Sequence, residues 1–349
     1  MTETELVVTH FNIPERISEV RPLGEGFIND TFIIVTSGKR YILQRKNKAI
    51  FPNIPGMMDN IDKVTRHIRQ KGHVTLQLTP ARDGKWYFLD DENEYWACCE
   101  FIENSVCYQT ASSPELIYAG GVGIGQFQAL LADFEGTLEE TLPGFHNIRY
   151  RFWQFDDALA KDAAGRNKSV RPEIDEVLAR KEQMMDFFQL IENGTIPKRI
   201  SHNDTKISNF LFKENGEILC AIDLDTVMQS SVLYDFGDAI RSYANVCAED
   251  EKDTSQVRMD LARFDAYTKG YLKEAACFLN ATERKKLAFA AIYITFEQFL
   301  RFLMDYMNGD TYYKIRYPEH NLVRAQSQLA LLRSMESQYD AMVKVQQQY

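Results

Sequence analysis

The sequence is most informative at Ile200-Ser-His-Asn-Asp-Thr-Lys-Ile-Ser-Asn209, which is followed by Ile222-Asp-Leu-Asp225. Between these segments lie two β-prone runs, FLFK and ILCAID, separated by Asn215-Gly216, a dipeptide typical of a two-residue hairpin turn. In register around that turn, Asn209 lies opposite the residue before Asp223. The pattern therefore predicts a hairpin whose open end brings an amide oxygen and a carboxylate together.

Oxygen ligands grouped in this way suit Mg²⁺, which takes a few protein oxygens together with nucleotide phosphates. The spacing H-x-D-x-K-x-x-N, which begins at His202, is that of the catalytic loop in the protein-kinase superfamily. Asn209 and Asp223 are then the metal ligands, Asp204 orients and deprotonates a substrate hydroxyl, and Lys206 neutralises charge on the transferred phosphoryl group. The alternative is a polar loop whose aspartates only cap turns. We favour the catalytic interpretation because it needs four residues to coincide with the hairpin, and all four are present: His202, Asp204, Asn209 and Asp223.

Length, composition and charge exclude several classes of protein. The chain has 349 residues, 45% of them hydrophobic, and a net charge of -10, which disfavours a nucleic-acid partner. No apolar run is long enough for a membrane helix, and the N-terminus lacks the pattern of a signal peptide. The six cysteines show no paired spacing. We expect a cytoplasmic protein with reduced thiols, no membrane partner, and a monomeric or weakly dimeric state.

The pattern of the chain changes near residue 104. Residues 1–104 contain mainly strand-like runs, including a hairpin over 31–45, and one amphipathic helix over about 55–71. Residues 105–349 contain mainly helical patterns, which are predicted over 116–134, 152–164, 172–192, 256–278, 282–307 and 321–345. The sequence therefore predicts an α+β protein with a β-rich N-terminal lobe, 1–104, and a larger helical C-terminal lobe, 105–349.

These motifs resemble the aminoglycoside phosphotransferase and choline kinase family, and the resemblance extends over most of the chain. Within that family the chain is most similar to bacterial N-acetylhexosamine 1-kinases. The segments that carry the likeness are Phe27-Ile-Asn-Asp-Thr-Phe, Leu43-Gln-Arg-Lys-Asn, Tyr234-Asp-Phe-Gly-Asp-Ala-Ile-Arg241 and Arg301-Phe-Leu-Met-Asp-Tyr-Met-Asn-Gly-Asp-Thr-Tyr-Tyr313. The resemblance implies a bilobal protein-kinase-like fold, ATP and Mg²⁺ as cofactors, and a sugar acceptor site in the helical lobe.

A glycine loop near the N-terminus is a candidate for covering the nucleotide. Gly24 and Gly26 precede the strand TFIIV, whereas a dinucleotide-binding turn would precede a helix. Backbone N–H groups of such a loop can approach phosphates closely. An ordinary hairpin turn is the alternative. A second glycine series, Gly121-Val-Gly-Ile-Gly125, lies within a helical pattern and predicts close helix packing.

The resemblance supplies further nucleotide contacts. Arg45 matches the strand position where related kinases place a cation on the phosphates, and Asp59 or Asp62 of the following helix is the candidate partner, unless that helix face is simply solvated. The segment from Glu100 to Ile102 resembles the hinge that binds the adenine edge through backbone groups; a plain buried strand end is the alternative.

Two groups of aspartates flank these motifs. Asp225 lies two residues after Asp223, so an extended segment would place both on one side, where Asp225 either binds a second Mg²⁺ or contacts only the catalytic loop. The carboxylates of Asp235 and Asp238 are expected to tie the metal strand to the helical lobe, the latter through an i,i+3 salt bridge with Arg241.

For the acceptor, the resemblance points to Arg301 and Tyr312 as sugar contacts, with Asn29 and His146 as weaker candidates. A planar donor and an aromatic face suit a pyranose with an acetamido group. The alternative is that Arg301 makes helical salt bridges with Glu297 or Asp305. The predicted activity is transfer of the ATP γ-phosphate to the anomeric hydroxyl of an N-acetylhexosamine. Its rivals are a kinase of another alcohol, such as choline, an aminoglycoside or another sugar, and a non-catalytic nucleotide-binding protein.

Overall fold

The computed structural model describes residues 3–24 and 28–349, so the predicted nucleotide contact at Gly26 lies outside the described residues. The chain forms two compact units. The first comprises Met1–Cys107, Asp133–Pro143 and Leu211–Gln229, and the second comprises Tyr108–Ala132, Gly144–Phe210 and Ser230–Tyr349. The first unit thus contains the whole expected N-terminal lobe and adds two segments that the sequence pattern assigned to the C-terminal lobe.

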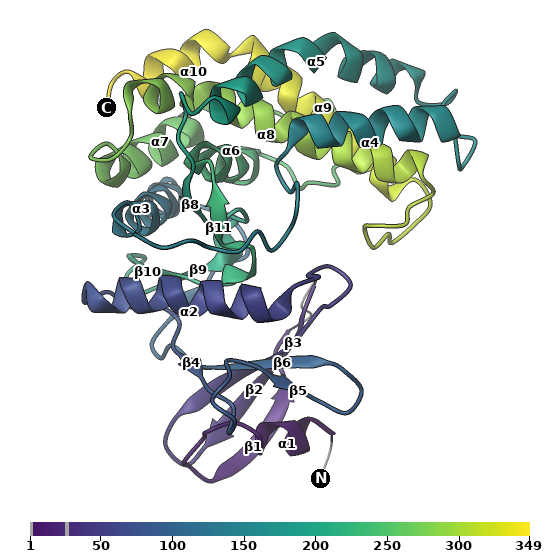
Figure 1. Ribbon diagram of the computed structural model, residues 1–349. Helices are drawn as coiled ribbons and strands as arrows, with labels where there is room; N and C mark the ends of the chain where they lie inside the picture. Colours follow the sequence, from purple (N-terminus) through teal and green to yellow (C-terminus); the bar gives the residue numbers. More distant parts are fainter. Residues whose placement is uncertain (1–2, 25–27) are drawn as a thin grey trace. The chain divides into compact units, whose positions relative to one another are not determined.

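The first unit is built on an antiparallel sheet in the order β1-β2-β3-β6-β4, with β5 on β6 (Figure 1). The expected hairpin over 31–45 is confirmed, since β2 pairs with β3 and Ile33 lies opposite Ile42. The strands and helices of this unit are α1 (Glu3–Val8), β1 (Ile17–Pro22), β2 (Asp30–Thr36), β3 (Arg40–Lys46), α2 (Ile54–Gln70), β4 (Leu78–Thr79), β5 (Phe88–Leu89), β6 (Tyr95–Glu100), β7 (Val106–Cys107), β10 (Ile218–Ala221) and the 3₁₀ helix η2 (Leu224–Thr226). Two further strands, β9 (Phe210–Phe212) and β11 (Met228–Ser230), each contain a boundary between the units.

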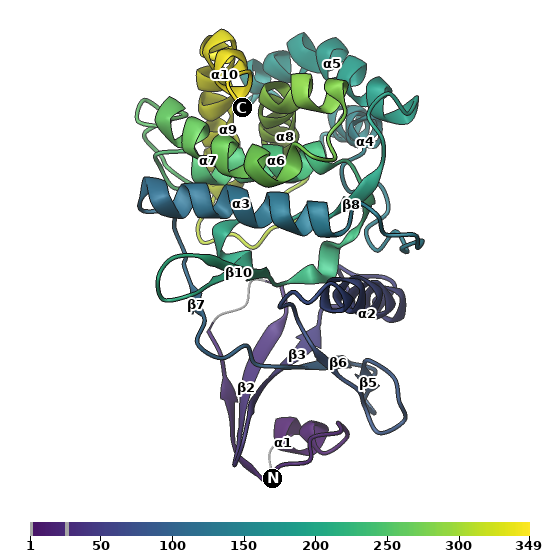
Figure 2. The same cartoon turned by 90° about the vertical axis from the view of Figure 1, so that its left-hand side faces the viewer.

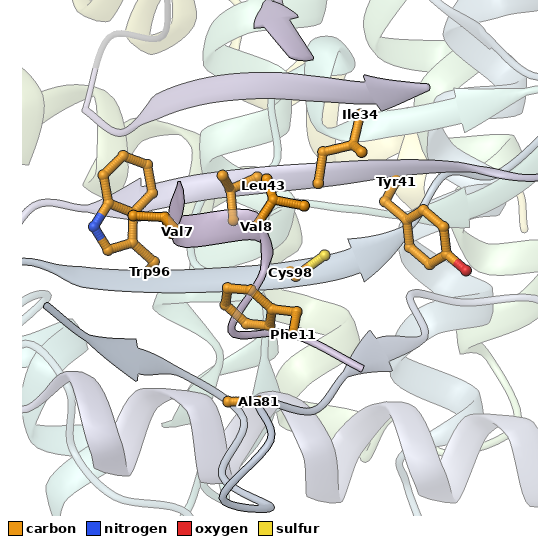
Figure 3. Close-up of a cluster of buried hydrophobic side chains, with 9 residues drawn as sticks. All are labelled: Val7, Val8, Phe11, Ile34, Tyr41, Leu43, Ala81, Trp96 and Cys98. Carbon is orange, nitrogen blue, oxygen red and sulfur yellow. The ribbon is translucent and has the colours of Figure 1, made fainter. Parts of the chain in front are cut away.

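One face of this sheet is covered by α1, a short helix that the sequence pattern did not predict. Figure 3 shows Val7 and Val8 of α1 beside Leu43 of β3, in a cluster that also includes Trp96 of β6. These side chains are at most 4% exposed, and burying such apolar area is the main stabilising contribution to folding. Six residues give too short a stretch for a helical period to be visible, which explains the omission.

The hairpin after the catalytic motif forms, but its predicted register is wrong by one residue. Gly216 donates its backbone N–H to the carbonyl of Lys213, and Lys213 donates its own N–H to the carbonyl of Glu217. This bonding encloses three loop residues instead of two, with Gly216 at a φ of 82°. Every cross-strand partner is therefore shifted by one position relative to the prediction.

The second unit is helical, as predicted (Figures 1 and 2). Helix α3 packs on α7, and α8 contacts α6 and α9. The elements are α3 (Pro114–Leu130), α4 (Ile148–Lys161), α5 (Arg171–Glu192), β8 (Arg199–Ser201), the 3₁₀ helix η1 (Ile207–Asn209), α6 (Val232–Tyr243), α7 (Leu261–Ala275), α8 (Ala281–Met307), α9 (His320–Ser337) and α10 (Tyr339–Gln346). The single helix expected over 321–345 is wrong in one respect, because it is divided at Gln338, which lies between α9 and α10.

The glycines of α3 confirm the prediction of close helix packing. A Cβ atom on Gly121 would lie 2.2 Å from the carbonyl oxygen of Tyr267, and one on Gly125 would lie 2.6 Å from that of Tyr271. Real Cβ atoms do not approach backbone oxygens this closely, so only glycine permits the observed contact between α3 and α7.

Helix α8 is long and apolar enough, by length and composition, to cross a membrane, with a mean hydropathy of 1.4 over its most apolar window. However, 89% of that window is buried inside the protein. A core helix of a helical unit has the same composition, because it is apolar on all sides. The burial therefore accounts for the apolar character of α8 without a membrane.

Candidate active site

The catalytic-loop motif lies in the second unit, between β8 and η1. The carboxylate oxygen Oδ2 of Asp204 accepts hydrogen bonds from Lys206 Nζ at 2.7 Å and from Asn209 Nδ2 at 2.9 Å. Neither bond uses Oδ1, and about 29% of the Asp204 side chain is exposed. The arrangement holds one oxygen in place and leaves the other to accept a proton from a bound hydroxyl.

The amide of Asn209 is oriented by the same contacts. Its Nδ2 also donates to the backbone carbonyl of Asp204 at 2.9 Å, so both hydrogen bonds use the nitrogen. The carbonyl oxygen Oδ1 is then the ligand atom that remains for a cation, which fits the predicted metal role.

Two carboxylates of α6, Asp235, which is buried, and Asp238, which is partly buried, anchor the backbone of this loop. Asp235 accepts the N–H groups of His202 at 2.9 Å and Asn203 at 2.7 Å, while Asp238 accepts the N–H of Thr205 at 3.1 Å. Burial raises the pKa of Asp235, and these donors oppose that change. These aspartates are expected from the sequence to tie the metal strand to the helical lobe, but the bonds observed go to the catalytic loop instead and fix its backbone on both sides of Asp204.

The predicted salt bridge on α6 is confirmed. Arg241 lies 2.8 Å from Asp238, at i,i+3. Burial alone would raise the pKa of Asp238, but the Arg241 guanidinium outweighs it and holds that pKa below its usual value. Gly237 of the same motif contacts α8 closely, since a Cβ there would lie 2.3 Å from the carbonyl oxygen of Ala290. The Asp-Phe-Gly triplet at 235–237 thus makes structural contacts: Asp235 binds the catalytic loop, and Gly237 packs against α8.

Two of the predicted site residues, Asn29 and Asp225, lie in the first unit around a buried ion pair. Lys46 Nζ lies 2.7 and 3.0 Å from the two carboxylate oxygens of Asp225, and both side chains are at most 6% exposed. Asn29 Nδ2 donates to the same carboxylate at 2.7 Å. The amide oxygen of Asn29 accepts the N–H of Asn47, so a substrate contact at Asn29 would have to displace one of these bonds.

Sequence reasoning did not select Lys46. It chose Arg45, whose side chain is 38% exposed at the end of the strand face that also carries Leu43, and which is hydrogen-bonded to Asp30. Side chains alternate along a strand, so adjacent residues point to opposite faces. Gln44 and Lys46 lie on the same face of β3, and Lys46 contacts Asp225 there. The burial of Lys46 would have identified it, but the sequence alone did not reveal that burial.

The proposed partners of Arg45 on α2 are engaged elsewhere. Asp59 pairs with Lys63 at 2.6 Å, and Asp62 pairs with Arg66 on the same helix. The other residue of interest on α2 is Asn60, which is buried. Its Nδ2 donates to the carbonyls of Glu139 at 2.9 Å and Val227 at 3.1 Å, and its Oδ1 accepts the N–H of Glu139.

The prediction that Asp223 and Asp225 share one side of an extended segment is wrong. Asp223 adopts the left-handed conformation, with a φ of 55°, and the 3₁₀ helix η2 begins after it. A non-glycine residue in this conformation costs of order 1 kcal/mol or more and is typical of functional sites. The two carboxylates therefore have different environments, with Asp223 half-buried and Asp225 buried against Lys46.

The predicted glycine loop and hinge segment are only partly described. Gly24 has a φ of 68°, and among residues 3–24 and 28–349 no atom lies within 4 Å of a Cβ atom placed on it. In the hinge segment the N–H of Glu100 already donates to the carbonyl of Gln77, and the carbonyl of Ile102 accepts the Ser105 hydroxyl. Neither bond uses the N–H of Ile102.

The predicted sugar contacts come together in the second unit. The Arg301 guanidinium lies 5.3 to 6.0 Å from the ring centroids of Phe145, Tyr313 and Tyr312. The predicted alternative salt bridges are not formed, because Glu297 pairs with His146 at 2.9 Å and Asp305 accepts backbone N–H groups. Arg301 thus presents its donors within an aromatic frame.

The donor chemistry fits a magnesium ion that is completed by a nucleotide. Within residues 3–24 and 28–349, no group of three His, Cys, Asp or Glu side chains could hold a metal by itself. Mg²⁺ is commonly bound by one or two protein carboxylates together with phosphates and waters. An amide oxygen and a carboxylate, the donor types that Asn209 and Asp223 carry, are ligands that Mg²⁺ accepts.

The chain belongs to the phosphotransferase enzyme family, which it matches over residues 19–276. Among solved structures, an aminoglycoside phosphotransferase from Alicyclobacillus acidocaldarius is 13% identical, with a TM-score of 0.62 over 97% of this chain and 96% of that one. A microcompartment-associated aminopropanol kinase is 15% identical, with a TM-score of 0.65 over 97% of each chain. An amicoumacin kinase in complex with AMP-PNP and Ca²⁺ is 16% identical, with a TM-score of 0.56 over 99% of this chain and 94% of that one. These likenesses confirm the α+β kinase-like fold.

Proposed function

We propose that the protein transfers the γ-phosphate of ATP to a hydroxyl group of a small molecule. The observation that carries the proposal is the state of Asp204, whose Oδ2 is held by Lys206 and Asn209 while the surrounding backbone is fixed by aspartates of α6. Phosphoryl transfer needs positioning and charge neutralisation more than covalent catalysis. The non-catalytic alternative has no use for a carboxylate presented in this way.

The proposal assigns a separate role to each residue of the motif. Asp204 orients the acceptor hydroxyl and takes its proton, and Lys206 neutralises the transferred group. Asn209 and Asp223 are the proposed Mg²⁺ ligands, and bound Mg²⁺ would neutralise the phosphate oxygens. The amicoumacin kinase binds a nucleotide analogue with a divalent cation, which supports ATP and a metal for this chain too.

Lys46 is the proposed phosphate-side cation of the first unit. It forms an ion pair with Asp225 in a buried environment, where a single unpaired charge would be costly. Arg45, by contrast, is available at the surface of the same strand, so a contact with phosphates remains a prediction for it.

For the acceptor we propose an N-acetylhexosamine that is phosphorylated at its anomeric hydroxyl. Arg301 offers hydrogen-bond donors among three aromatic rings, and the pKa of the nearby Arg151 is lowered by burial and by the charge of Arg301. Two guanidinium groups oppose a cationic acceptor such as choline or an aminoglycoside. A neutral, hydroxyl-rich ligand with a carbonyl group suits them better.

The acceptor can be identified by measuring ATP consumption with free sugars, amino alcohols and aminoglycosides. We expect N-acetylglucosamine or N-acetylgalactosamine to be the preferred class and the product to be a 1-phosphate. Phosphorus NMR coupling to the anomeric proton identifies that product, which also lacks a reducing end. A 6-phosphate, or a preference for aminopropanol or an aminoglycoside, would refute the acceptor assignment and leave the kinase chemistry intact.

The matching test of the acceptor residues compares Arg301→Ala with the wild type. The acceptor KM should rise while the KM for ATP stays nearly constant, because removing an interaction shared by bound substrate and transition state weakens uniform binding. The proposed setting remains the cytoplasm, with a monomeric or weakly dimeric chain and no nucleic-acid partner, as the sequence composition predicts.

A further inference from the structure

The segment after α8 returns to the helix from which it came. Helix α8 ends at Met307, and Gly309, with a φ of 90°, allows the chain to reverse there. The N–H of Asp310 then donates to the carbonyl of Asp305, one turn earlier. The next residues, 311–313, include Tyr312 and Tyr313, whose rings frame the Arg301 guanidinium.

The Asp305 carboxylate holds this returning segment. Its Oδ1 accepts the N–H groups of Thr311 at 2.9 Å and Tyr312 at 2.8 Å, and its Oδ2 accepts that of Tyr313 at 2.9 Å. Asn321 of α9 adds a fourth donor at 2.8 Å. Three successive backbone N–H groups converging on one carboxylate fix the direction of the segment more firmly than a single bond could.

This carboxylate is in a position that helix stability does not favour. Asp305 lies in the last turn of α8, where a negative charge opposes the helix dipole and no basic residue of that turn compensates it. It is also one turn from Arg301, the usual position for an i,i+4 ion pair, yet its oxygens point to the backbone of 311–313. The side chain is only 5% exposed.

We infer that Asp305 is a positioning residue for the acceptor site: by binding the three N–H groups, it sets Tyr312 and Tyr313 against Arg301. The inference rests on the proposed function, since it assumes that Arg301 and Tyr312 contact the acceptor. The Asp305 carboxylate bonds to the backbone of the segment and to Asn321. Its influence on the acceptor is therefore exerted through the tyrosines.

The first test compares Asp305→Asn with Asp310→Asn, using the best acceptor of the wild-type enzyme. Asp310 is a carboxylate of the same segment, but its oxygens bind Arg166 and Asn321 instead of the tyrosine N–H groups. Asp305→Asn should raise the acceptor KM about tenfold or more, as expected for losing charge-assisted hydrogen bonds, with the KM for ATP unchanged. An equal rise in Asp310→Asn, or no rise in Asp305→Asn, would overturn the inference.

A double-mutant cycle separates positioning from general loosening. In a Tyr312→Ala background, Asp305→Asn should raise the acceptor KM by a clearly smaller factor than in the wild type, because the side chain through which it acts is already gone. Independent, multiplicative effects would contradict the inference. The KM for ATP serves as the internal control in all four proteins.

Amide hydrogen exchange tests the anchor without any substitution. In the wild-type protein the N–H groups of Thr311, Tyr312 and Tyr313 should exchange far more slowly than an unprotected loop. Exchange at the rate of an unfolded segment would overturn the inference even if Asp305→Asn fails to fold. If no tested alcohol is phosphorylated, the proposed function fails, whereas slow exchange would still support the anchor.

Discussion

Two adjacent cations of β3, Arg45 and Lys46, differ in burial. The Lys46 side chain is 3% exposed and forms an ion pair with Asp225, whereas the Arg45 side chain is 38% exposed and pairs with Asp30. Removing one partner of a buried ion pair strongly lowers the free energy of unfolding, because the other charge stays unpaired in a low-dielectric environment. Exposed pairs contribute little. Lys46 should therefore matter more for both folding and nucleotide binding.

This difference predicts the effects of two substitutions. Lys46→Met should lower the free energy of unfolding by about 3 to 5 kcal/mol, since it leaves Asp225 buried and unpaired. Arg45→Gln, the matched control, should change it by less than about 1 kcal/mol. Urea unfolding measures both, and calorimetric titration with Mg·ATP shows whether affinity follows the same order. A larger loss in Arg45→Gln would contradict the assignment of Lys46.

At Asp204 the expected effect is on turnover. Asp204→Asn keeps the size of the side chain but removes the proton acceptor, so kcat should fall by about two to four powers of ten. Nucleotide affinity should stay close to that of the wild type, because the proposed role of Asp204 concerns the acceptor. Single-turnover kinetics and nucleotide titration provide the two readouts. A folded variant with near-normal kcat would refute the role of Asp204.

Helix α2 stabilises the segment around Asp225 through the neutral side-chain amide of Asn60 and not through a charged side chain. All three hydrogen bonds of Asn60 go to backbone groups of residues 139 and 227, and Thr141 donates to the carbonyl of Asp225. Helix α2 also contacts η2. The position of the acidic segment thus depends on a neutral, fully bonded side chain of this helix.

Asn60→Ala should lower the free energy of unfolding by about 1 to 3 kcal/mol, because it removes the buried bond to the Val227 carbonyl and the two part-buried bonds to the backbone of Glu139. It should also weaken Mg·ATP binding. Asp59→Ala is the matched control on the same helix, since Asp59 is exposed and pairs with Lys63 at the surface. That control should stay within about 0.5 kcal/mol of the wild type. Equal effects of the two substitutions on unfolding would show that the bonds of Asn60 are unimportant.

The elements also show where sequence patterns are sufficient. The predicted span of α8, 282–307, differs from the observed helix by one residue at Ala281, because its apolar period extends over many turns. The predicted hairpin at Asn215-Gly216 is one residue out of register, since this dipeptide suits both a two-residue turn and the three-residue loop observed. A local pattern therefore identifies an element more reliably than its exact pairing.

In the molecule as a whole, some of the residues discussed belong to a recognisable sequence motif and others do not. Asp204, Lys206 and Asn209 lie within one short motif and are joined by hydrogen bonds in the structure. Asn60 and Asp305, by contrast, make contacts with backbone groups that no sequence spacing specifies. A motif reflects chemistry that requires a fixed spacing. The supporting contacts depend instead on how the chain turns back, as after Asp305, or on how distant segments fold together, as at Asn60.

The charges of the whole chain predict its response to acid. Among the described carboxyl groups, Lys71 holds the pKa of Asp133 at about 2, and the pKa values of Asp238 and Glu297 are also lowered, because the charges of Arg241 and His146 outweigh burial. Burial raises the pKa of Asp235, which acts in the opposite direction. The lowered groups are more numerous, so the native state binds fewer protons than the unfolded state in moderate acid.

The free energy of unfolding should therefore be highest above about pH 5 and should fall as the pH is lowered through about 4, where the unfolded carboxyl groups take up protons first. Urea unfolding at a series of pH values measures this slope. Asp133→Asn should flatten the slope below about pH 4, because it removes a group that is still ionised there in the folded protein. A free energy that stays constant or rises on acidification would mean that the raised pKa of Asp235 outweighs the lowered ones.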